Sequence, residues 1–311
     1  MWLKGNLHTH TTFSDGDSEP SEVCRRYADN GYHFLSITDH GVFVDPADLR
    51  CSDLVLIPGI ELSTAATNEP QLPIHVNGFG IRGSVAVQQA ETKSQTVQNC
   101  IDAIRAAGGI AQINHPNFHF ALNAYDISRT RGACLLEIYN GHPQVQNDGD
   151  EAHIGVEELW DQLLTAGMLI YGTAVDDSHH FRGEFHAKRA NPFRGWVWVR
   201  VRKPSVREIL HGLATGDFYA STGVRLQDTY VDGWRYYVII DTAGSSSNGQ
   251  DAYVTQFIGD NGKVLLETTL PRSEFNLRQA GGARYVRARV LGPNGTKAWC
   301  QPRLIPEFWR R

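Results

Sequence analysis

Residues 6–16 read NLHTHTTFSDG and place two histidines and an aspartate close to the amino terminus. The segment 2–10 is predicted to be the first β-strand, and His8 and His10 stand at its end. Because side chains alternate along a strand, both imidazoles point to the same side. A first strand that ends in paired imidazoles indicates a functional site more than it indicates core packing.

The first two thirds of the chain alternate strand-like and helix-like segments. Further candidate strands lie at residues 33–40, 54–62, 74–80, 109–116, 134–141 and 169–177. Between them lie amphipathic segments, of which residues 156–164 carry the clearest apolar stripe with the helical period. Repeated strand–helix units predict an α/β fold with a parallel sheet, either open or closed into a barrel.

Near Gly223 the alternation of strand-like and helix-like segments ends, and strand-like segments follow one another. The remaining candidate strands lie at residues 235–240, 252–270 and 283–305. Asn261-Gly262 and Asn294-Gly295 are strong signals for hairpin turns between such strands. We therefore predict an α/β domain at 1–223 and a small antiparallel, sandwich-like β domain at 224–311, with the stretch 243–250 as a loop.

Composition and charge exclude several classes of function. The 311 residues are 41% hydrophobic and 20% charged, with a net charge of -5, so no broad attraction for nucleic acid or anionic membranes is expected. A local basic groove at 181–196 is conceivable, but this stretch is predicted to be a solvated loop. No apolar run approaches the ~20 residues of a membrane span, and the amino terminus leaves no room for a signal peptide. The five scattered cysteines predict reduced thiols and a cytoplasmic location.

Imidazole or carboxylate recurs at successive strand ends. The candidates are His8, His10, Asp15, His40, Glu61, His75, His115, Asp177 and His179. In parallel α/β proteins the carboxyl ends of the strands gather at one face, which hosts the active site. So many donors would repel one another or lack partners without a cation between them. Donor sets of histidine and carboxylate without thiolate suit Zn, Mn or Fe, and nine donors are too many for one ion. We therefore predict two or three divalent metal ions, with Glu61 able to bridge two of them.

Six motifs carry a family resemblance. NLHTHTTFSDG, SITDHG, GIELS, HVNGFG, INHP and DDSH, in this order, resemble the PHP (polymerase and histidinol phosphatase) superfamily over roughly residues 3–180. The resemblance implies a distorted (β/α)7 barrel with a centre of two or three metals. EELWDQLLTAG, YGTAVDDSH, GDFYASTG and YVRARVLGPNGTKAWCQP further resemble the branch of carbaryl-hydrolase-like metallohydrolases, which carries a carboxyl-terminal β domain.

The resemblance also implies how the donors are shared. It implies one metal held by His8, His10, Glu61 and Asp177, a second by Glu61, His75 and His115, and a third by Asp15, His40 and His179. Asp177 is preferred to Asp176 because D-x-H is the family spacing. Asp39 is expected to orient a ligand or support the strand end, and His180 and His186 are expected to be structural or to support the ligands.

The implied reaction is the hydrolysis of small phosphate mono- or diesters. A hydroxide that bridges two metals would attack, and the metals would act as Lewis acids. The expected catalytic residues are His179, Asp15, His40 and Glu61, with His179 or Asp15 assisting the leaving group. Cationic side chains that could grip the anionic substrate follow the last metal motif. They are Arg182, Lys188, Arg189 and Arg194.

Three alternatives remain open. A carbamate or carboxylic ester could replace the phosphate; a mouth with few cations, lined by Trp196, Phe181, Phe118 and His119, would favour it, whereas clustered arginines would favour phosphate. A nucleic-acid exonuclease would need a basic track beside the mouth and fits poorly with the net negative charge. A non-catalytic metal-binding accessory domain is the third. A small-molecule phosphate ester is the expected partner, with no membrane and no nucleic acid; substrate identity and oligomeric state stay open.

Overall fold

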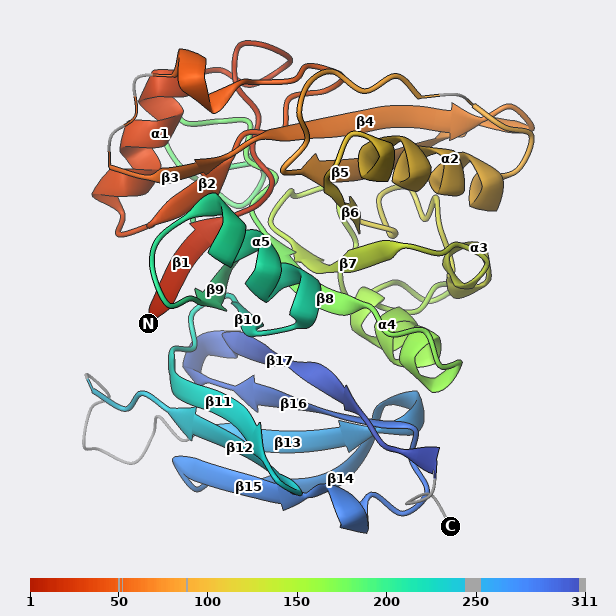
Figure 1. Ribbon diagram of the computed structural model, residues 1–311, viewed down its shortest axis with the longest axis vertical. Helices are drawn as coiled ribbons and strands as arrows, with labels where there is room; N and C mark the ends of the chain where they lie inside the picture. Colours follow the sequence, from red (N-terminus) through yellow and green to blue (C-terminus); the bar gives the residue numbers. More distant parts are fainter. Residues whose placement is uncertain (50, 52, 88, 244–252, 308–311) are drawn as a thin grey trace.

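The computed structural model describes residues 1–49, 51, 53–87, 89–243 and 253–307, and most of the predicted loop at 243–250 lies outside them. An α/β part occupies the top of Figure 1, and an all-β part lies below it, formed by the end of the chain. The mixed α/β class predicted from the sequence is confirmed. No helix among the described residues is long and apolar enough to cross a membrane.

The described residues of the α/β part form ten strands, five helices and one short 3-10 helix. They are β1 (Trp2–Asn6), α1 (Pro20–Asp29), β2 (Phe34–Ser36), η1 (Pro46–Asp48), β3 (Val55–Ile57), β4 (Gly59–Ala66), β5 (Glu69–Phe79), α2 (Lys93–Ala106), β6 (Ile110–Ile113), α3 (Ala124–Ser128), β7 (Ala133–Asn140), α4 (Val156–Thr165), β8 (Tyr171–Val175), β9 (Trp196–Arg200), α5 (Val206–Thr215) and β10 (Phe218–Ser221). The predicted helix over 156–164 is confirmed, and it buries Trp160 and Leu164 in the core against the five-stranded sheet.

The strands form two main sheets in this part, and their directions correct the prediction of a parallel sheet. The larger sheet has the order β10-β9-β1-β2-β3 in this part and continues past β10 into the carboxyl-terminal part of the chain, with nine strands in all among the described residues. A five-stranded sheet has the order β4-β5-β6-β7-β8. β1, β2 and β3 are parallel, as are β6, β7 and β8. However, β5 is antiparallel to both of its neighbours, and β9 is antiparallel to β1. The two-residue turn between β4 and β5 can join only antiparallel strands.

The two sheets meet through isolated backbone bridges. Thr9 pairs with Ser178 and His40 with Glu61, both in parallel fashion. The continuous β-ladders among the described residues do not close into a barrel, so the closed (β/α)7 barrel remains a prediction. Glu61 lies near the start of β4 and not at a strand end as predicted, because Pro58 interrupts the candidate strand 54–62. Proline lacks the amide hydrogen that a central ladder needs.

The carboxyl-terminal part is antiparallel β structure, as predicted. Its elements are β11 (Leu226–Asp232), β12 (Arg235–Ile240), β13 (Val254–Gly259), η2 (Asp260–Gly262), β14 (Lys263–Thr268), β15 (Arg272–Asn276), η3 (Leu277–Gln279), β16 (Tyr285–Leu291), η4 (Pro293–Gly295) and β17 (Lys297–Leu304). Asn261 and Asn294 both adopt left-handed backbone angles, with φ of 55° and 56°, at the two predicted hairpin turns. β10 pairs with β17, so the nine-stranded sheet continues from one part into the other.

The domain boundary at 223/224 falls between β10 and β11 and stays a prediction. A buried ion pair adds to the contact between the two parts. Arg287 of β16 donates to both carboxylate oxygens of Asp161 on α4, at 2.7 and 2.6 Å, and the Tyr285 hydroxyl donates to Asp161 at 2.6 Å. All three side chains are buried. The five cysteines are free thiols, and the cytoplasmic location inferred from them stays a prediction.

Candidate metal centre

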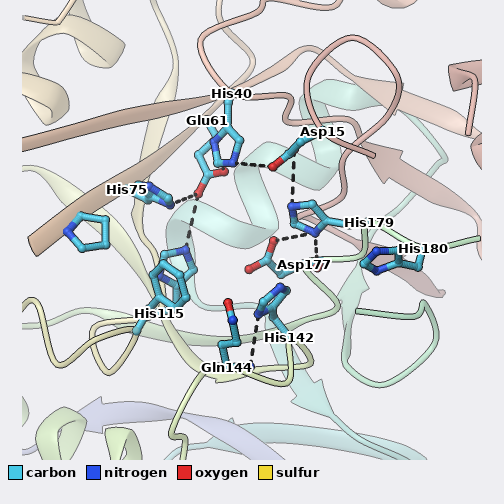
Figure 2. A pocket seen from close by; sticks show the side chains of 12 residues that line it. Asp15, His40, Glu61, His75, His115, His142, Gln144, Asp177, His179 and His180 are labelled. Atoms are coloured by element: carbon cyan, nitrogen blue, oxygen red, sulfur yellow. Dashed lines mark hydrogen bonds and ion pairs between the residues drawn. The ribbon is translucent and has the colours of Figure 1, made fainter. Parts of the chain in front are cut away.

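Nine side chains that are far apart in the sequence lie close together, and seven of them line one cavity of about 430 Å³ (Figure 2). They are the nine predicted donors: His8, His10, Asp15, His40, Glu61, His75, His115, Asp177 and His179. Most of them follow strands β1, β2, β6 and β8, whereas Glu61 and His75 lie within the paired strands β4 and β5. The structure thus brings every predicted donor to one place.

The floor of the centre is fully buried. His8 Nε2 lies 3.3 Å from Glu61 Oε2 and 3.3 Å from Asp177 Oδ1. His10 Nε2 lies 3.3 Å and 3.2 Å from the same two oxygens. Two imidazoles and two carboxylates therefore converge on one point, which agrees with the donor set expected for the first metal.

Glu61 presents its two oxygens to different donors. Oε1 lies 3.1 Å from His75 Nδ1 and 3.5 Å from His115 Nε2, while Oε2 faces His8 and His10. One carboxylate oxygen thus belongs to each of two donor sets. This is the geometry that a bridging carboxylate requires.

The third donor set lies at the outer end of the cavity. Asp15 carboxylate oxygens lie 3.5 Å from His40 Nε2 and 3.5 Å from His179 Nε2 (Figure 2). The Asp15 side chain is 53% exposed, unlike the buried floor, so this set is the most open to solvent. His10 Nδ1 is 3.4 Å from Asp15 and links the outer set to the floor.

Asp39 holds the loop that carries Asp15. It accepts hydrogen bonds from the Thr11 backbone amide at 2.8 Å, from the Thr11 hydroxyl at 2.7 Å and from the Ser14 hydroxyl at 2.6 Å. Its side chain is buried. This carboxylate supports the loop and does not join the donors, in keeping with the support expected of it.

One buried polar atom of the floor has no hydrogen-bond partner among the described residues, which tests whether a cation fits. Glu61 Oε2 is buried and accepts no hydrogen bond of ordinary geometry. His8 Nε2 and His10 Nε2 lie 3.1 Å apart, while His8 Nδ1 lies 2.7 Å from Glu137. A proton on Nδ1 leaves a lone pair on His8 Nε2 that points into the centre. The donor set therefore fits divalent metal ions.

The electrostatics keep the two carboxylates of the floor in metal-binding form. Burial alone would raise the pKa of Glu61, but His8 and His75 outweigh it and hold this pKa well below its ordinary value. The pKa of Asp177 is likewise held well below its usual range by His8 and His10, against the effect of burial. Burial lowers the pKa of His10 and of His75, whereas neighbouring carboxylates outweigh burial and raise the pKa of the other four donor histidines, His8, His40, His115 and His179. A bound ion would displace the protons that these carboxylates favour, because a ligating imidazole is neutral.

The adjacent aspartates after β8 have separate positions. Asp177 points into the cavity from a left-handed backbone with φ of 49° (Figure 2). Asp176 points away and accepts hydrogen bonds from the backbone amides of Phe193, Arg194 and Gly195 at 2.6–2.9 Å. The geometry favours Asp177 as the donor and gives Asp176 the task of holding the loop before β9.

The four predicted substrate-binding cations do not line the cavity. Arg182 faces Glu22 at 3.6 Å, and Arg189 faces Asp17 at 3.6 Å. Lys188 is exposed. The Arg194 guanidinium donates to the carbonyls of Gly141 and His186 at 2.7 and 2.8 Å. None of the described residues that line the cavity is an arginine or lysine, so a substrate role for these four stays a prediction without support from the cavity.

The wall of the cavity beyond the donors is formed by Pro73, Phe118, His142, Gln144 and His180. Of the aromatic residues considered for the mouth, only Phe118 is on this wall. Phe181 is buried elsewhere, His119 is exposed, and Trp196 packs against the Lys4 ammonium at 4.2 Å. His180, expected to be structural, lines the cavity, whereas His186 does not.

Sequence reasoning missed Glu137, Gln112, Asn114, Asn140 and His142. Glu137 is buried next to His8, and Asn114 donates to Glu61 Oε1 at 2.8 Å. The available signal was a set of polar residues inside the candidate strands 109–116 and 134–141, which otherwise consist of core residues.

No family model matches the chain. Among curated proteins, a 5′-3′ exoribonuclease of Haemophilus influenzae is 24% identical over 204 residues, which are 63% of this chain and 73% of that protein. The 5′-3′ exoribonuclease Rnm of Escherichia coli is 32% identical over 114 residues, which are 33% of this chain and 38% of that protein.

A solved structure matches nearly the whole chain. A two-domain protein from Bacteroides vulgatus, described as containing a predicted PHP-like metal-dependent phosphoesterase, superposes with a TM-score of 0.51 at 15% identity. The match covers 97% of this chain and 95% of that one. The PHP resemblance drawn from the sequence is thus confirmed at the level of the fold. The closer likeness to the carbaryl-hydrolase branch stays a prediction.

Proposed function

We propose that the protein is a metal-dependent hydrolase of phosphate mono- or diesters. The observation that carries the proposal is the shared carboxylate of Glu61, whose two oxygens face separate sets of imidazoles 3.0–3.5 Å away. A structural site would need one closed donor set, whereas adjoining sets beside an open cavity are typical of hydrolytic centres. The fold shared with a PHP-like protein supports the same conclusion.

The side chains of this chain would hold two or three divalent ions, of Zn, Mn or Fe. The donor sets that the resemblance implies are His8, His10, Glu61 and Asp177; Glu61, His75 and His115; and Asp15, His40 and His179. In the structure, the donor atoms that lie within 4.8 Å of one another form overlapping groups: His10, Asp15, His40 and His179; His8, Glu61 and His115; His8, His10 and Asp177; and His40, Glu61 and His75. When bound, such ions supply Lewis-acid stabilisation of the phosphoryl oxygens and lower the pKa of water.

The residues at the outer end of the cavity would act on the leaving group. Asp15 and His179 lie within 3.5 Å of each other, both line the cavity, and Asp15 is half-exposed. The substrate must enter past them because the floor is buried. Where this outer set holds no ion, a proton between His179 Nε2 and Asp15 can pass to the departing oxygen, which is the role expected of these two residues.

The second candidate function is hydrolysis of a carbamate or carboxylic ester at the same centre. The observation that favours it is the absence of arginine and lysine from the described cavity wall, together with the presence of Phe118 and Pro73. A doubly charged phosphate ester would depend on the bound metals alone for its countercharge. A neutral ester would bury its apolar group against Phe118 without that demand.

Nucleic acid is the third possible substrate, suggested by the names of the two curated relatives. The net charge of -5 does not favour a long polyanion, and the described cavity wall provides no basic side chain except histidine. We therefore place small esters before RNA.

One panel separates these functions. Metal-free protein is reloaded with Mn²⁺ or Zn²⁺ and assayed on aryl phosphomonoesters, phosphodiesters, aryl carboxylic esters, an aryl carbamate and a 5′-phosphorylated RNA oligonucleotide. Turnover of the phosphate esters, lost in the metal-free protein, is expected. Faster turnover of the carboxylic ester or carbamate would establish the second function, and turnover of RNA alone the third. No turnover at full metal loading would refute all three and favour an accessory role.

A further inference from the structure

A buried carboxylate beneath the floor of the centre accepts hydrogen bonds from four residues. Glu137 is 1% exposed. Its Oε1 lies 2.7 Å from His8 Nδ1 and accepts from Gln112 Nε2 at 2.9 Å. Its Oε2 accepts from the His115 backbone amide at 2.8 Å and from Asn140 Nδ2 at 2.9 Å. One carboxylate thus holds residues from two of the donor sets.

Two amides connect Glu137 to the shared carboxylate. Gln112 Nε2 donates to Glu137 and also to Asn114 Oδ1 at 3.3 Å. Asn114 Nδ2 in turn donates to Glu61 Oε1 at 2.8 Å. These residues are all buried, so bulk solvent does not compete for their hydrogen bonds. The position of Glu61 is therefore tied to that of Glu137.

A third amide connects Glu137 to the carboxylate on the other side. Asn140 Nδ2 donates to Glu137 Oε2 at 2.9 Å and to Asp177 Oδ2 at 3.1 Å. Its two hydrogens fit these two acceptors. An unbroken path of side-chain hydrogen bonds thus runs from Glu61 through Glu137 to Asp177.

The orientation of each amide is fixed by its own oxygen. Gln112 Oε1 accepts from the Thr173 hydroxyl at 2.9 Å, and Asn140 Oδ1 accepts from the His142 backbone amide at 2.7 Å. Asn114 Oδ1 accepts from Gln112. All three amide nitrogens therefore point toward carboxylates. Neutral amide donors thus separate the three buried carboxylates and give each of them a hydrogen bond.

We propose that Glu137 is a positioning residue that couples the first two metal sites, a role that rests on the proposed metal-dependent function. It fixes His8 with the proton on Nδ1, which leaves Nε2 for the first site. It also fixes the backbone of His115, whose Nε2 serves the second site. Removing its charge must therefore weaken both sites together, although Glu137 itself touches neither ion nor substrate.

The test is a zinc titration of the metal-free full-length chain in competition with a chelating indicator. Wild-type protein is expected to bind at least two equivalents tightly. E137Q is expected to raise both dissociation constants by about 10- to 100-fold, the usual effect of removing a carboxylate that supports a histidine ligand. E157Q, which removes a partly buried carboxylate on α4 that is paired with Arg287, is the matched control and should keep the wild-type constants.

A second readout separates positioning from general loss of structure. Nitrogen NMR of the metal-free wild-type protein should show His8 protonated on Nδ1, and E137Q should lose this signature. N140A removes the hydrogen bonds from Asn140 to Glu137 and Asp177 but keeps the contact between Glu137 and His8. It should weaken zinc binding by a smaller factor and serves if E137Q does not fold.

Two results would overturn the proposal: wild-type zinc constants in E137Q and N140A, or equal weakening in E137Q and E157Q. A wild-type protein that binds no zinc would refute the metal-dependent function itself, and the coupling with it. That result is recognisable because it does not depend on any substitution at Glu137.

Discussion

His40 and Glu61 are joined both by their backbones and by their side chains. Their backbones form a parallel β-bridge, and His40 Nδ1 lies 3.0 Å from Glu61 Oε2. The next amide, that of Gly41, donates to the Glu61 carbonyl at 2.8 Å. This bridge is one of the places where the two sheets meet. The donors are therefore brought together by the junction of the sheets, and the centre depends on that junction.

Replacement of Glu61 by glutamine tests the shared carboxylate. One of the two oxygens becomes an NH2 group that cannot ligate, so one of the two inner donor sets loses its carboxylate ligand while the side-chain volume is kept. We expect a fall in kcat/KM of about 100-fold or more and the loss of at least one bound metal, measured by steady-state kinetics and elemental analysis. Glu91→Gln, at an exposed position, is the control and should change neither quantity. Full metal content with unchanged kcat/KM in E61Q would contradict the bridging role.

Replacement of His10 by alanine tests the floor of the centre. His10 Nε2 lies 3.2–3.3 Å from both Glu61 and Asp177. Its loss therefore removes a metal ligand and also removes one of the imidazoles that face these two buried carboxylates. We expect hydrolysis to fall below detection while the circular dichroism spectrum is kept. His211→Ala, an exposed histidine on α5, should behave as wild type. Activity retained in H10A would refute the metal assignment.

The donors could be predicted because their chemistry is local to the sequence. His8 and His10 have no packing reason to follow an apolar strand, and the same holds for His115 after β6 and Asp177 after β8. Each is a short-range signal. Their convergence follows from the general rule that strand ends share a face.

Residues outside this pattern could not be predicted. Glu137 lies inside β7, whose sequence predicts a strand of buried core residues. Only the fold reveals that His8 is the partner of Glu137. Arg194 follows the last motif but its backbone is held by Asp176, which turns its side chain away from the cavity. Strand direction was missed because local sequence does not encode it, as the antiparallel β5 shows.

The ion pair between the two parts of the chain predicts a large stability effect. Asp161→Ala leaves the buried Arg287 guanidinium without its bidentate partner and the Tyr285 hydroxyl without its acceptor. We expect the free energy of unfolding to fall by about 3 kcal/mol or more, measured by urea denaturation. Arg202→Ala removes an ion pair whose arginine side chain is 88% exposed and should leave the urea midpoint unchanged. Equal effects of the two substitutions would show that burial of the pair is unimportant.

Glu157 predicts how stability depends on acid pH. Burial by itself would raise the pKa of this carboxyl, but Arg287 and Arg289 outweigh it and lower the pKa from 4.5 to about 2. Its contribution to stability is therefore complete above pH 4.5 and is lost as the pH falls from 4.5 toward 2. The shift corresponds to about 3 kcal/mol. Urea denaturation between pH 2.5 and 7 should show a smaller acid-dependent loss in E157Q than in wild type. Parallel stability–pH curves would contradict this.

Metal ions should stabilise the fold, because the donors approach one another only in the folded chain. Folded protein binds the ions and unfolded chain does so weakly, so a free concentration about 1,000 times the dissociation constant adds roughly 4 kcal/mol. For a chain of this size the thermal midpoint should rise by about 6 °C when Zn²⁺ or Mn²⁺ is added to metal-free protein, and a chelator should reverse it. Scanning calorimetry measures the shift. H10A should show less of it, whereas H211A should show all of it. If the midpoint rises equally in H10A and wild type, the stabilising ions bind elsewhere than at the floor formed by His8, His10, Glu61 and Asp177.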